Sequence, residues 1–145
     1  MLRTHTCGEL RKDMAEHETI LCGWVDSRRD HGKLVFIDIR DRYGLTQVVF
    51  IKSVSPEAYE LARTLKAEDS IQVTGQVVPR SAKTVNPGLP TGEVEVCAQK
   101  LVIFSKSQDL PFPLQDADTV GDDLRLTWRY LDMRRPRMQE RIITR

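Results

Sequence analysis

The chain has 145 residues, 40% of them hydrophobic, which is enough for one well-buried core and at most a short appendage. Its 22 lysines and arginines nearly balance its 21 aspartates and glutamates, which excludes a strongly basic surface over the whole chain. The first ten residues lack the apolar segment of a signal peptide, and no run approaches the ~18 apolar residues that cross a membrane. We therefore expect a soluble, cytoplasmic protein without a membrane partner.

The three cysteines, Cys7, Cys22 and Cys97, are odd in number and form no CxxC pair. Isolated cysteines of this kind are typical of reduced thiols in an intracellular protein. Their spacing does not match that of a metal-binding motif, so no metal is expected.

Alternation of apolar and polar residues predicts three strands in the first part of the chain, over residues 19–25, 34–40 and 45–51. A charged turn over residues 27–33 separates the first strand from the second. A four-residue turn of sequence DRYG joins the second strand to the third, which is typical of a β-hairpin.

A helix and two more strands complete the pattern. Ser55 followed by Pro56 predicts a capped helix that continues to about residue 67. Strands over residues 70–78 and 93–104 follow, separated by an exposed loop rich in Pro, Gly, Asn and Thr. Three strands, one helix and two strands is the order of an OB-fold, a five-stranded barrel that binds oligonucleotides on its second and third strands. We therefore predict an all-β fold with one helix, a five-stranded OB-fold barrel.

The last part of the chain has a different character. Residues 106–123 are rich in proline and acidic residues without periodicity, which predicts a linker or hinge. Residues 124–145 have helical spacing, interrupted at Pro136, and an excess of arginine that suits a polyanion, an interface or a solvated helix face. The helical pattern continues to the last residue, so we expect this chain to be the front of a longer protein.

Phe36 and Gln47 fall on the second and third predicted strands, where an OB-fold binds its ligand. Val35 and Ile37 share one face of their strand, so Phe36 lies on the other. An aromatic ring beside a carboxamide can stack on a base and hydrogen-bond to its edge, which is how single-stranded RNA is read. A core phenylalanine and an ordinary surface glutamine are the alternatives.

Five segments occur in a distinctive order: CGWV at 22–25, RRDHG at 28–32, FIDIRDRYGLTQVVF at 36–50, NPGLPTGEVEV at 86–96 and RYLDMRRP at 129–136. Together they resemble bacterial-type aspartyl-tRNA synthetase, a class II aspartate–tRNA ligase, in its N-terminal anticodon-binding region. The resemblance covers nearly the whole chain. Single segments are less specific, because lysyl- and asparaginyl-tRNA synthetases carry related barrels.

The resemblance implies an OB-fold anticodon-binding domain at residues 1–105, a linker at 106–123 and the truncated start of a class II catalytic domain at 124–145. For the full-length enzyme it implies a homodimer that uses ATP and magnesium to form aspartyl-adenylate and then aminoacylates tRNA. For this chain it implies a monomer that binds tRNA but not DNA, with no catalytic residue, no cofactor and no activity alone.

The resemblance also assigns roles to residues of the barrel. Phe36 would stack on the central anticodon uridine, and Gln47 would pair with the edge of the same base. Glu95 would accept hydrogen bonds from the first anticodon base, a guanine or its modified form. Arg29 would contact bases or phosphates from the first turn, and Arg28 would make a weaker phosphate contact.

The loop at residues 79–92 would wrap the last anticodon base, which makes Arg80 and Asn86 candidates; ordinary loop solvation is the alternative. Lys66 stands near the end of the predicted helix, where many relatives carry arginine, and offers a point charge in place of a bidentate guanidinium. The expected anticodon-binding residues are thus Arg29, His31, Phe36, Gln47, Lys66, Arg80, Asn86 and Glu95.

His31 bears on which tRNA is bound. The aspartate and asparagine anticodons differ only at the last base, C against U. In this family a leucine at this turn position accompanies strict aspartate specificity, and a histidine accompanies a relaxed form that charges both tRNAs. Imidazole donates or accepts according to its tautomer and so tolerates either base. We expect tRNA(Asp) as the partner and favour tRNA(Asn) as a second one; a solvated turn histidine is the alternative.

Two other functions fit parts of the pattern. A free-standing RNA-binding OB-fold module would explain the barrel but not the RYLDMRRP segment. A fragment of an asparaginyl- or lysyl-tRNA synthetase would share Phe36 and Gln47, because those anticodons also have a central uridine. The segment at 86–96 and the RRDHG turn favour the aspartyl enzyme.

Overall fold

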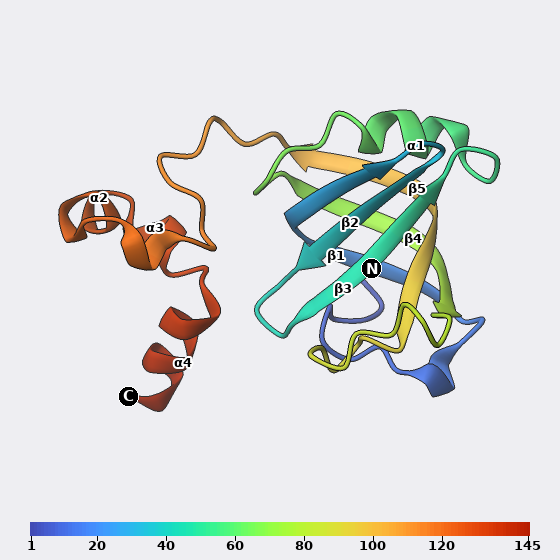
Figure 1. Cartoon of the computed structure of the whole chain (residues 1–145), viewed down its shortest axis with the longest axis horizontal. Coiled ribbons are helices and arrows are strands. Elements are labelled where there is room, and N and C mark those ends of the chain that lie inside the picture. The colour runs from blue at the N-terminus through green and yellow to red at the C-terminus, as the bar shows by residue number, and fades with distance from the viewer. The chain divides into compact units, whose positions relative to one another are not determined.

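The computed structural model describes every residue from Met1 to Arg145 and divides into two compact units, Met1–Ser107 and Gln108–Arg145. Five strands of the first unit form a closed barrel (Figure 1). They are β1 (Glu18–His31), β2 (Leu34–Arg40), β3 (Leu45–Ile51), β4 (Ser70–Pro79) and β5 (Val94–Ser105). Their order around the barrel is β1-β2-β3-β5-β4, and only β3 and β5 are parallel neighbours. With helix α1 (Pro56–Ala62) between β3 and β4, this arrangement confirms the predicted fold class.

The barrel core follows from the alternation of each strand. On β2, the side chains of Val35, Ile37 and Ile39 are buried, whereas Phe36 between them is partly exposed on the outer face. Phe50 on β3 is the largest fully buried side chain. Together with the apolar face of α1, these side chains form one continuous hydrophobic cluster inside the barrel. The alternation therefore leaves the outer face of β2 available for other contacts.

The first strand is longer than predicted. The expected charged turn over residues 27–33 is wrong, because β1 continues to His31 and pairs with β2 up to His31 opposite Leu34. Only Gly32 and Lys33 remain as the turn, with Gly32 at a φ of 62°, which suits glycine. The charged side chains at this end of β1 are mostly exposed where the β1–β2 hairpin, here called the β1–β2 arm, reaches its turn, so no apolar alternation signals the strand.

Helix α1 differs from the prediction in its cap and its length. Ser55 precedes Pro56 as expected, but its hydroxyl makes no capping hydrogen bond. The hydroxyl is buried and donates to the carbonyl oxygen of Ala98 on β5 at 2.8 Å instead. The helix ends at Ala62, several residues earlier than predicted, and the chain after it turns back so that Leu65 is buried in the barrel core.

The second unit has a small core of its own. It contains three short helices, α2 (Asp122–Thr127), α3 (Arg129–Asp132) and α4 (Pro136–Thr144). Leu131 of α3 packs in a hydrophobic cluster with Phe112, Leu114 and Ala117, which come from the stretch expected to be a linker or hinge. These three side chains are spaced without a helical or strand period. None of the helices combines the length and apolar character needed to cross a bilayer.

Candidate nucleic-acid interface

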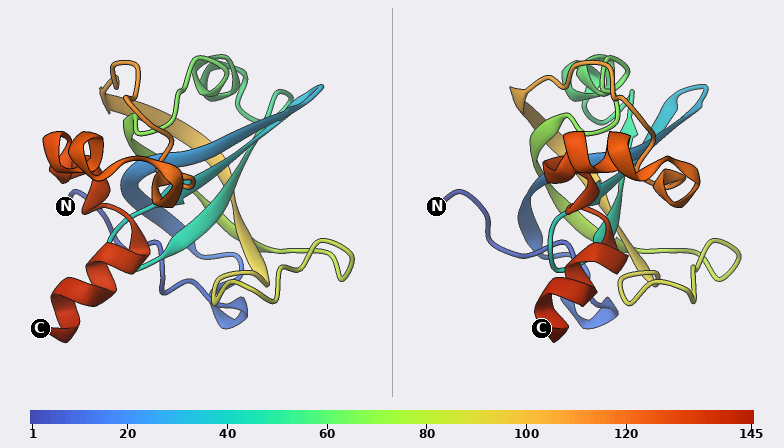
Figure 2. Two further views of the ribbon diagram at one scale, coloured as in Figure 1. Left: turned by 60° about the vertical axis from the view of Figure 1, so that its left-hand side comes forward. Right: turned by 90° about the vertical axis from the view of Figure 1, so that its left-hand side faces the viewer.

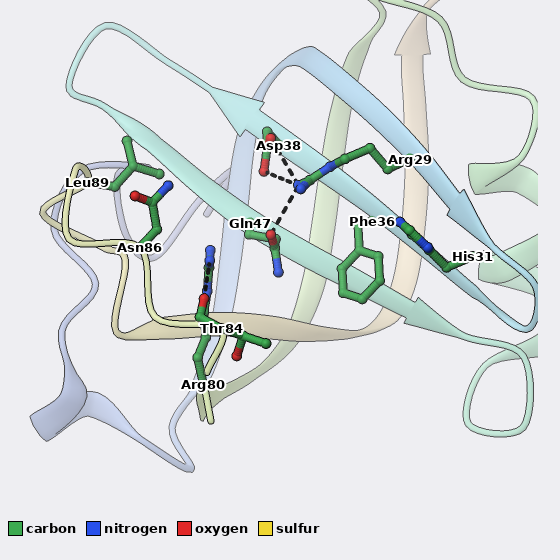
Figure 3. A pocket seen from close by; sticks show the side chains of 9 residues that line it. All are labelled: Arg29, His31, Phe36, Asp38, Gln47, Arg80, Thr84, Asn86 and Leu89. Atoms are coloured by element: carbon green, nitrogen blue, oxygen red, sulfur yellow. Dashed lines mark hydrogen bonds and ion pairs between the residues drawn. The ribbon is translucent and has the colours of Figure 1, made fainter. Parts of the chain in front are cut away.

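The outer faces of β1, β2 and β3 form the floor of a pocket of about 370 Å³ (Figure 3). Figure 2 shows that the β1–β2 arm and the loop between β4 and β5 project from the same side of the barrel. The pocket lies between these two projections, and its lining residues are Arg29, His31, Phe36, Asp38, Gln47, Arg80, Thr84, Asn86 and Leu89.

Phe36 provides the aromatic surface of this pocket. It lies opposite Arg29 in the β1–β2 register and opposite Val49 in the β2–β3 register. The ring of His31 meets the Phe36 ring edge to face, with centroids 5.6 Å apart. The Arg29 guanidinium lies 5.9 Å from the centroid of the Phe36 ring, within the range of a cation–π contact. These neighbours hold the ring upright on the outer face of the sheet.

Gln47 occupies the centre of a hydrogen-bond network beside this ring. Its side-chain oxygen accepts a hydrogen bond from Arg29 Nη2 at 3.0 Å, and its side-chain nitrogen donates to Glu95 at 2.6 Å. Arg29 Nη2 also contacts both carboxylate oxygens of Asp38, at 3.1 and 3.2 Å. Gln47 is only 8% exposed, and its amide is oriented by hydrogen bonds to the charged side chains of Arg29 and Glu95.

The loop between β4 and β5 forms the opposite wall of the pocket. Arg80 donates to the carbonyl oxygens of Val94 at 3.0 Å and Thr84 at 3.3 Å, so its guanidinium braces the loop. The Asn86 side-chain oxygen accepts the Gly88 N–H at 3.0 Å and closes a local turn. These hydrogen bonds give the wall a defined shape, while residues 81–88 of the loop remain exposed to solvent.

The structure brings most of the sequence-predicted site residues together. Arg29, His31, Phe36, Gln47, Arg80 and Asn86 line the pocket, and Glu95 does not line it but accepts a hydrogen bond from Gln47. Lys66 does not line it, because it lies in the turn between α1 and β4, where its N–H donates to Asp69. Arg28 also points elsewhere and donates to the carbonyl oxygens of Arg63 and Leu65.

Sequence reasoning assigned no role to Asp38, Thr84 or Leu89, which also line the pocket. For Asp38 a signal existed, since period-two spacing puts it on the same face as Phe36. For the two loop residues no comparable signal exists, because loop side chains have no periodicity.

The thiols of the barrel have no place in this site. Burial raises the pKa of Cys7, Cys22 and Cys97 above the ordinary thiol value, so all three are protonated at neutral pH. No group of three or more His, Cys, Asp or Glu side chains lies close enough together to hold a metal ion. The chemistry that the pocket offers is therefore stacking, hydrogen bonding and charge.

Comparison with known proteins gives a consistent picture. The family model described as OB-fold nucleic acid binding domain matches residues 19–104, which include nearly all of the five barrel strands. The chain is 50% identical over 143 residues to the "Aspartate--tRNA(Asp/Asn) ligase" of Caldanaerobacter subterraneus and 52% identical over 143 residues to that of Anaeromyxobacter dehalogenans. Each alignment covers 99% of this chain but 24% of the relative, so the chain spans about a quarter of their length.

Solved structures share the fold. The asparaginyl-tRNA synthetase from Pyrococcus horikoshii complexed with asparaginyl-adenylate superposes with a TM-score of 0.80 at 30% identity, over 94% of this chain and 30% of that one. A putative aspartyl-tRNA synthetase from Leishmania major also has a TM-score of 0.80, over 91% of this chain and 28% of that one. Because the sequence identity is only 23%, the second similarity shows the fold alone.

Proposed function

The chain belongs to the family of OB-fold nucleic acid binding domains, and on that premise we propose that its pocket binds the anticodon of a tRNA. The observation that carries the proposal is the placement of Phe36 and Gln47 side by side in one pocket. The ring stacks on the central uridine, and the amide hydrogen-bonds to the edge of that base. Arg29 and Arg80 supply positive charge for the phosphates.

The whole protein is an aspartate–tRNA ligase in this proposal. The similarity to ligases of that name over 99% of this chain supports it. The barrel and the linker position the tRNA, and residues 124–145 begin a class II catalytic domain. Formation of aspartyl-adenylate with ATP and magnesium, and homodimerisation, belong to the remaining length of the protein. The proposed setting is the cytoplasm, where tRNA is charged.

The tRNA partners are tRNA(Asp) and, through His31, tRNA(Asn). The relatives are named for both tRNAs, which supports the broader specificity. His31 lines the pocket beside Phe36, so its imidazole is available to the anticodon base that follows the stacked one in the RNA. Its imidazole can donate or accept and thus suits either C or U at the last anticodon position.

The direct test is binding of this chain to RNA stem-loops that carry the anticodons GUC, GUU and GCC at one salt concentration. Tight binding to GUC and GUU but not to GCC supports uridine readout and both tRNA partners. Binding to GUC alone keeps anticodon recognition and removes tRNA(Asn) as a partner. Equal binding to all three means that the barrel is a generic RNA-binding module, and the proposal fails.

A further inference from the structure

The hydrogen bonds around Gln47 determine which end of its amide donates and which end accepts. Arg29 has only N–H groups and can bond only to the amide oxygen, at 3.0 Å. The Glu95 carboxylate has only acceptors when ionised and can bond only to the amide nitrogen, at 2.6 Å. A rotation of the amide by 180° would put its nitrogen against the guanidinium and its oxygen against the carboxylate. One of the two orientations is therefore strongly favoured.

Arg29 in turn is held by Asp38. The Arg29 side chain is 48% exposed and would be free to adopt other rotamers on its own, whereas Asp38 is 20% exposed. Both carboxylate oxygens of Asp38 lie within 3.2 Å of Arg29 Nη2, and the hydroxyl of Ser27 donates to one of them at 2.8 Å. Asp38 is also the cross-strand partner of Gln47, so Arg29 bridges the two residues of one pair in the β2–β3 ladder.

The fixed amide has one N–H and one oxygen lone pair left for a ligand. Uracil offers an N3–H donor next to carbonyl acceptors, and cytosine offers an N3 acceptor next to an amino donor. In the pose that satisfies uracil, the N3 acceptor of cytosine would face the amide oxygen, and its amino donor would face the amide N–H. An amide that rotates freely can match either base, but an amide held in one orientation can match only one.

We propose that Asp38 and Glu95 are positioning residues that hold the Gln47 amide in the orientation that accepts uracil and rejects cytosine. Glu95 acts on the amide directly, and Asp38 acts through Arg29. This inference rests on the proposed function, because it concerns the base that the pocket selects. It assigns to Asp38 a role in base selection without contact to the base, and to Glu95 a role in addition to contact with the first anticodon base.

The test measures a ratio of affinities, because base selection is a difference between two ligands. Dissociation constants for the GUC and GCC stem-loops are measured with the complete chain, with Asp38→Ala and with Glu95→Gln. We expect the unsubstituted chain to prefer the central uridine by roughly tenfold or more, a factor that corresponds to about 1.4 kcal/mol. Both variants should lower this ratio severalfold. Glu95→Gln replaces an acceptor by a side chain that can face either end of the Gln47 amide. Asp38→Ala releases Arg29, which holds the amide oxygen.

A charge-matched control separates selection from electrostatics. Asp30 is an exposed carboxylate on β1 that pairs with Arg28 at 3.4 Å and does not line the pocket. Asp30→Ala removes the same charge as Asp38→Ala, so it should change both affinities alike and leave the ratio intact. The amide resonances of Gln47 in the free variants provide a second readout: they should shift in Asp38→Ala and Glu95→Gln and not in Asp30→Ala.

Each outcome decides the matter. A lowered ratio in both variants, with shifted Gln47 resonances, supports the inference. An unchanged ratio in Asp38→Ala and Glu95→Gln, in a chain that prefers GUC, overturns it and leaves anticodon binding in place. If the unsubstituted chain does not distinguish GUC from GCC, uridine readout itself fails and the inference falls with it. Should Asp38→Ala not fold, Asp38→Asn takes its place, since an uncharged amide no longer holds Arg29 by an ion pair. A ratio lowered in one variant only assigns the positioning role to that residue and removes it from the other.

Discussion

At the scale of the residue, Phe36 is a large apolar side chain on the outer face of a barrel whose other phenylalanine on this hairpin, Phe50, is fully buried. The two rings come from adjacent strands and have opposite surroundings. Phe50 fills the core with the apolar residues of every strand. Phe36 instead contacts His31 and Arg29, which are polar and partly solvated. An aromatic ring in such surroundings contributes little to folding and is available for stacking.

Replacing Phe36 by alanine is therefore expected to affect RNA binding and not stability. Loss of one stacked base should weaken binding of the GUC stem-loop by about 1–3 kcal/mol, as measured by fluorescence anisotropy. Phe50→Ala is the matched control and should lower the free energy of unfolding by about 3–5 kcal/mol. A large loss of stability in Phe36→Ala, with unchanged affinity per folded molecule, would identify Phe36 as a core residue.

His31 offers the second prediction at this scale. If His31 is the residue that relaxes specificity at the last anticodon position, its imidazole admits the uridine of GUU in addition to the cytidine of GUC, and His31→Leu removes that tolerance. Binding of the GUU stem-loop should then fall more than binding of the GUC stem-loop, by roughly the 1 kcal/mol of one hydrogen bond. Titrations of both RNAs with both proteins measure this difference. Equal losses for the two RNAs would contradict the role.

At the scale of the element, the loop between β4 and β5 is kept in shape by its own backbone. The Asn86 N–H donates to the Gly92 carbonyl oxygen at 3.0 Å, and Gly92 N–H donates to Leu89 at 3.0 Å. A Cβ atom on Gly92 would collide with the carbonyl group of Asn86. Glycine at this position is required by close approach, and the wall of the pocket depends on it.

Gly92→Ala should consequently disturb the loop and weaken RNA binding. The clash lies in the backbone and cannot be relieved by a side-chain rotation, so we expect overpacking strain of about 1–3 kcal/mol. Affinity for the GUC stem-loop should fall, whereas the sheet content seen by circular dichroism should stay the same. Gly121→Ala is the control, because a Cβ there would meet nothing within 4 Å. Unchanged affinity in Gly92→Ala would show that this wall does not contact the RNA.

At the scale of the whole molecule, each unit contains an aspartate whose pKa is lowered in the folded state. In the first unit, burial of Asp69 acts to raise its pKa, but hydrogen bonds from the backbone N–H groups of Lys66 and Ser107 outweigh burial and lower it. In the second unit, a hydrogen bond from Arg135 lowers the pKa of Asp118. Asp69 ties the barrel to Ser107, which follows its last strand, and Asp118 pairs with Arg135 and Arg137 at the start of α4.

Both units should accordingly lose stability in acid. A carboxyl group whose pKa is lower in the folded state than in the unfolded state, about 3.9 for aspartate, stabilises the fold above the unfolded value. That contribution is lost as the pH falls through the folded value. Urea unfolding between pH 7 and pH 3 should show a falling midpoint below about pH 4, where unperturbed aspartate begins to protonate.

Asp69→Asn measures how much of the acid sensitivity of the barrel comes from Asp69. The amide cannot accept both backbone N–H groups, so we expect a loss of about 1–3 kcal/mol at pH 7. Because the variant has no proton to gain at this position, its stability should fall less between pH 7 and pH 3. Parallel pH profiles for the two proteins would contradict the assigned cause.

The sequence alone was sufficient for the local features of this protein. Alternation along β2 places Phe36 on the face opposite Val35 and Ile37, and the order of strands and helix is that of the barrel observed. Prediction from the sequence failed where a segment lacks an alternating pattern of apolar and polar residues, as at the charged end of β1. It also failed for Ser55, whose hydroxyl bonds to a strand that comes much later in the chain. Periodicity reports the immediate surroundings of a residue and nothing more distant.

The tertiary structure alone decided which of the candidate residues meet. Gln47 and Glu95 are 48 positions apart, and closing the barrel brings their side chains within 2.6 Å. Lys66 belongs to the turn after α1 and lies outside the pocket, although its charge suits the same ligand. Whether a segment forms a strand depends on its neighbouring residues, whereas the register of one strand against another depends on how the whole core packs. For that reason the sequence determined the barrel and its outward-facing residues, and only the closed barrel determined the network that orients Gln47.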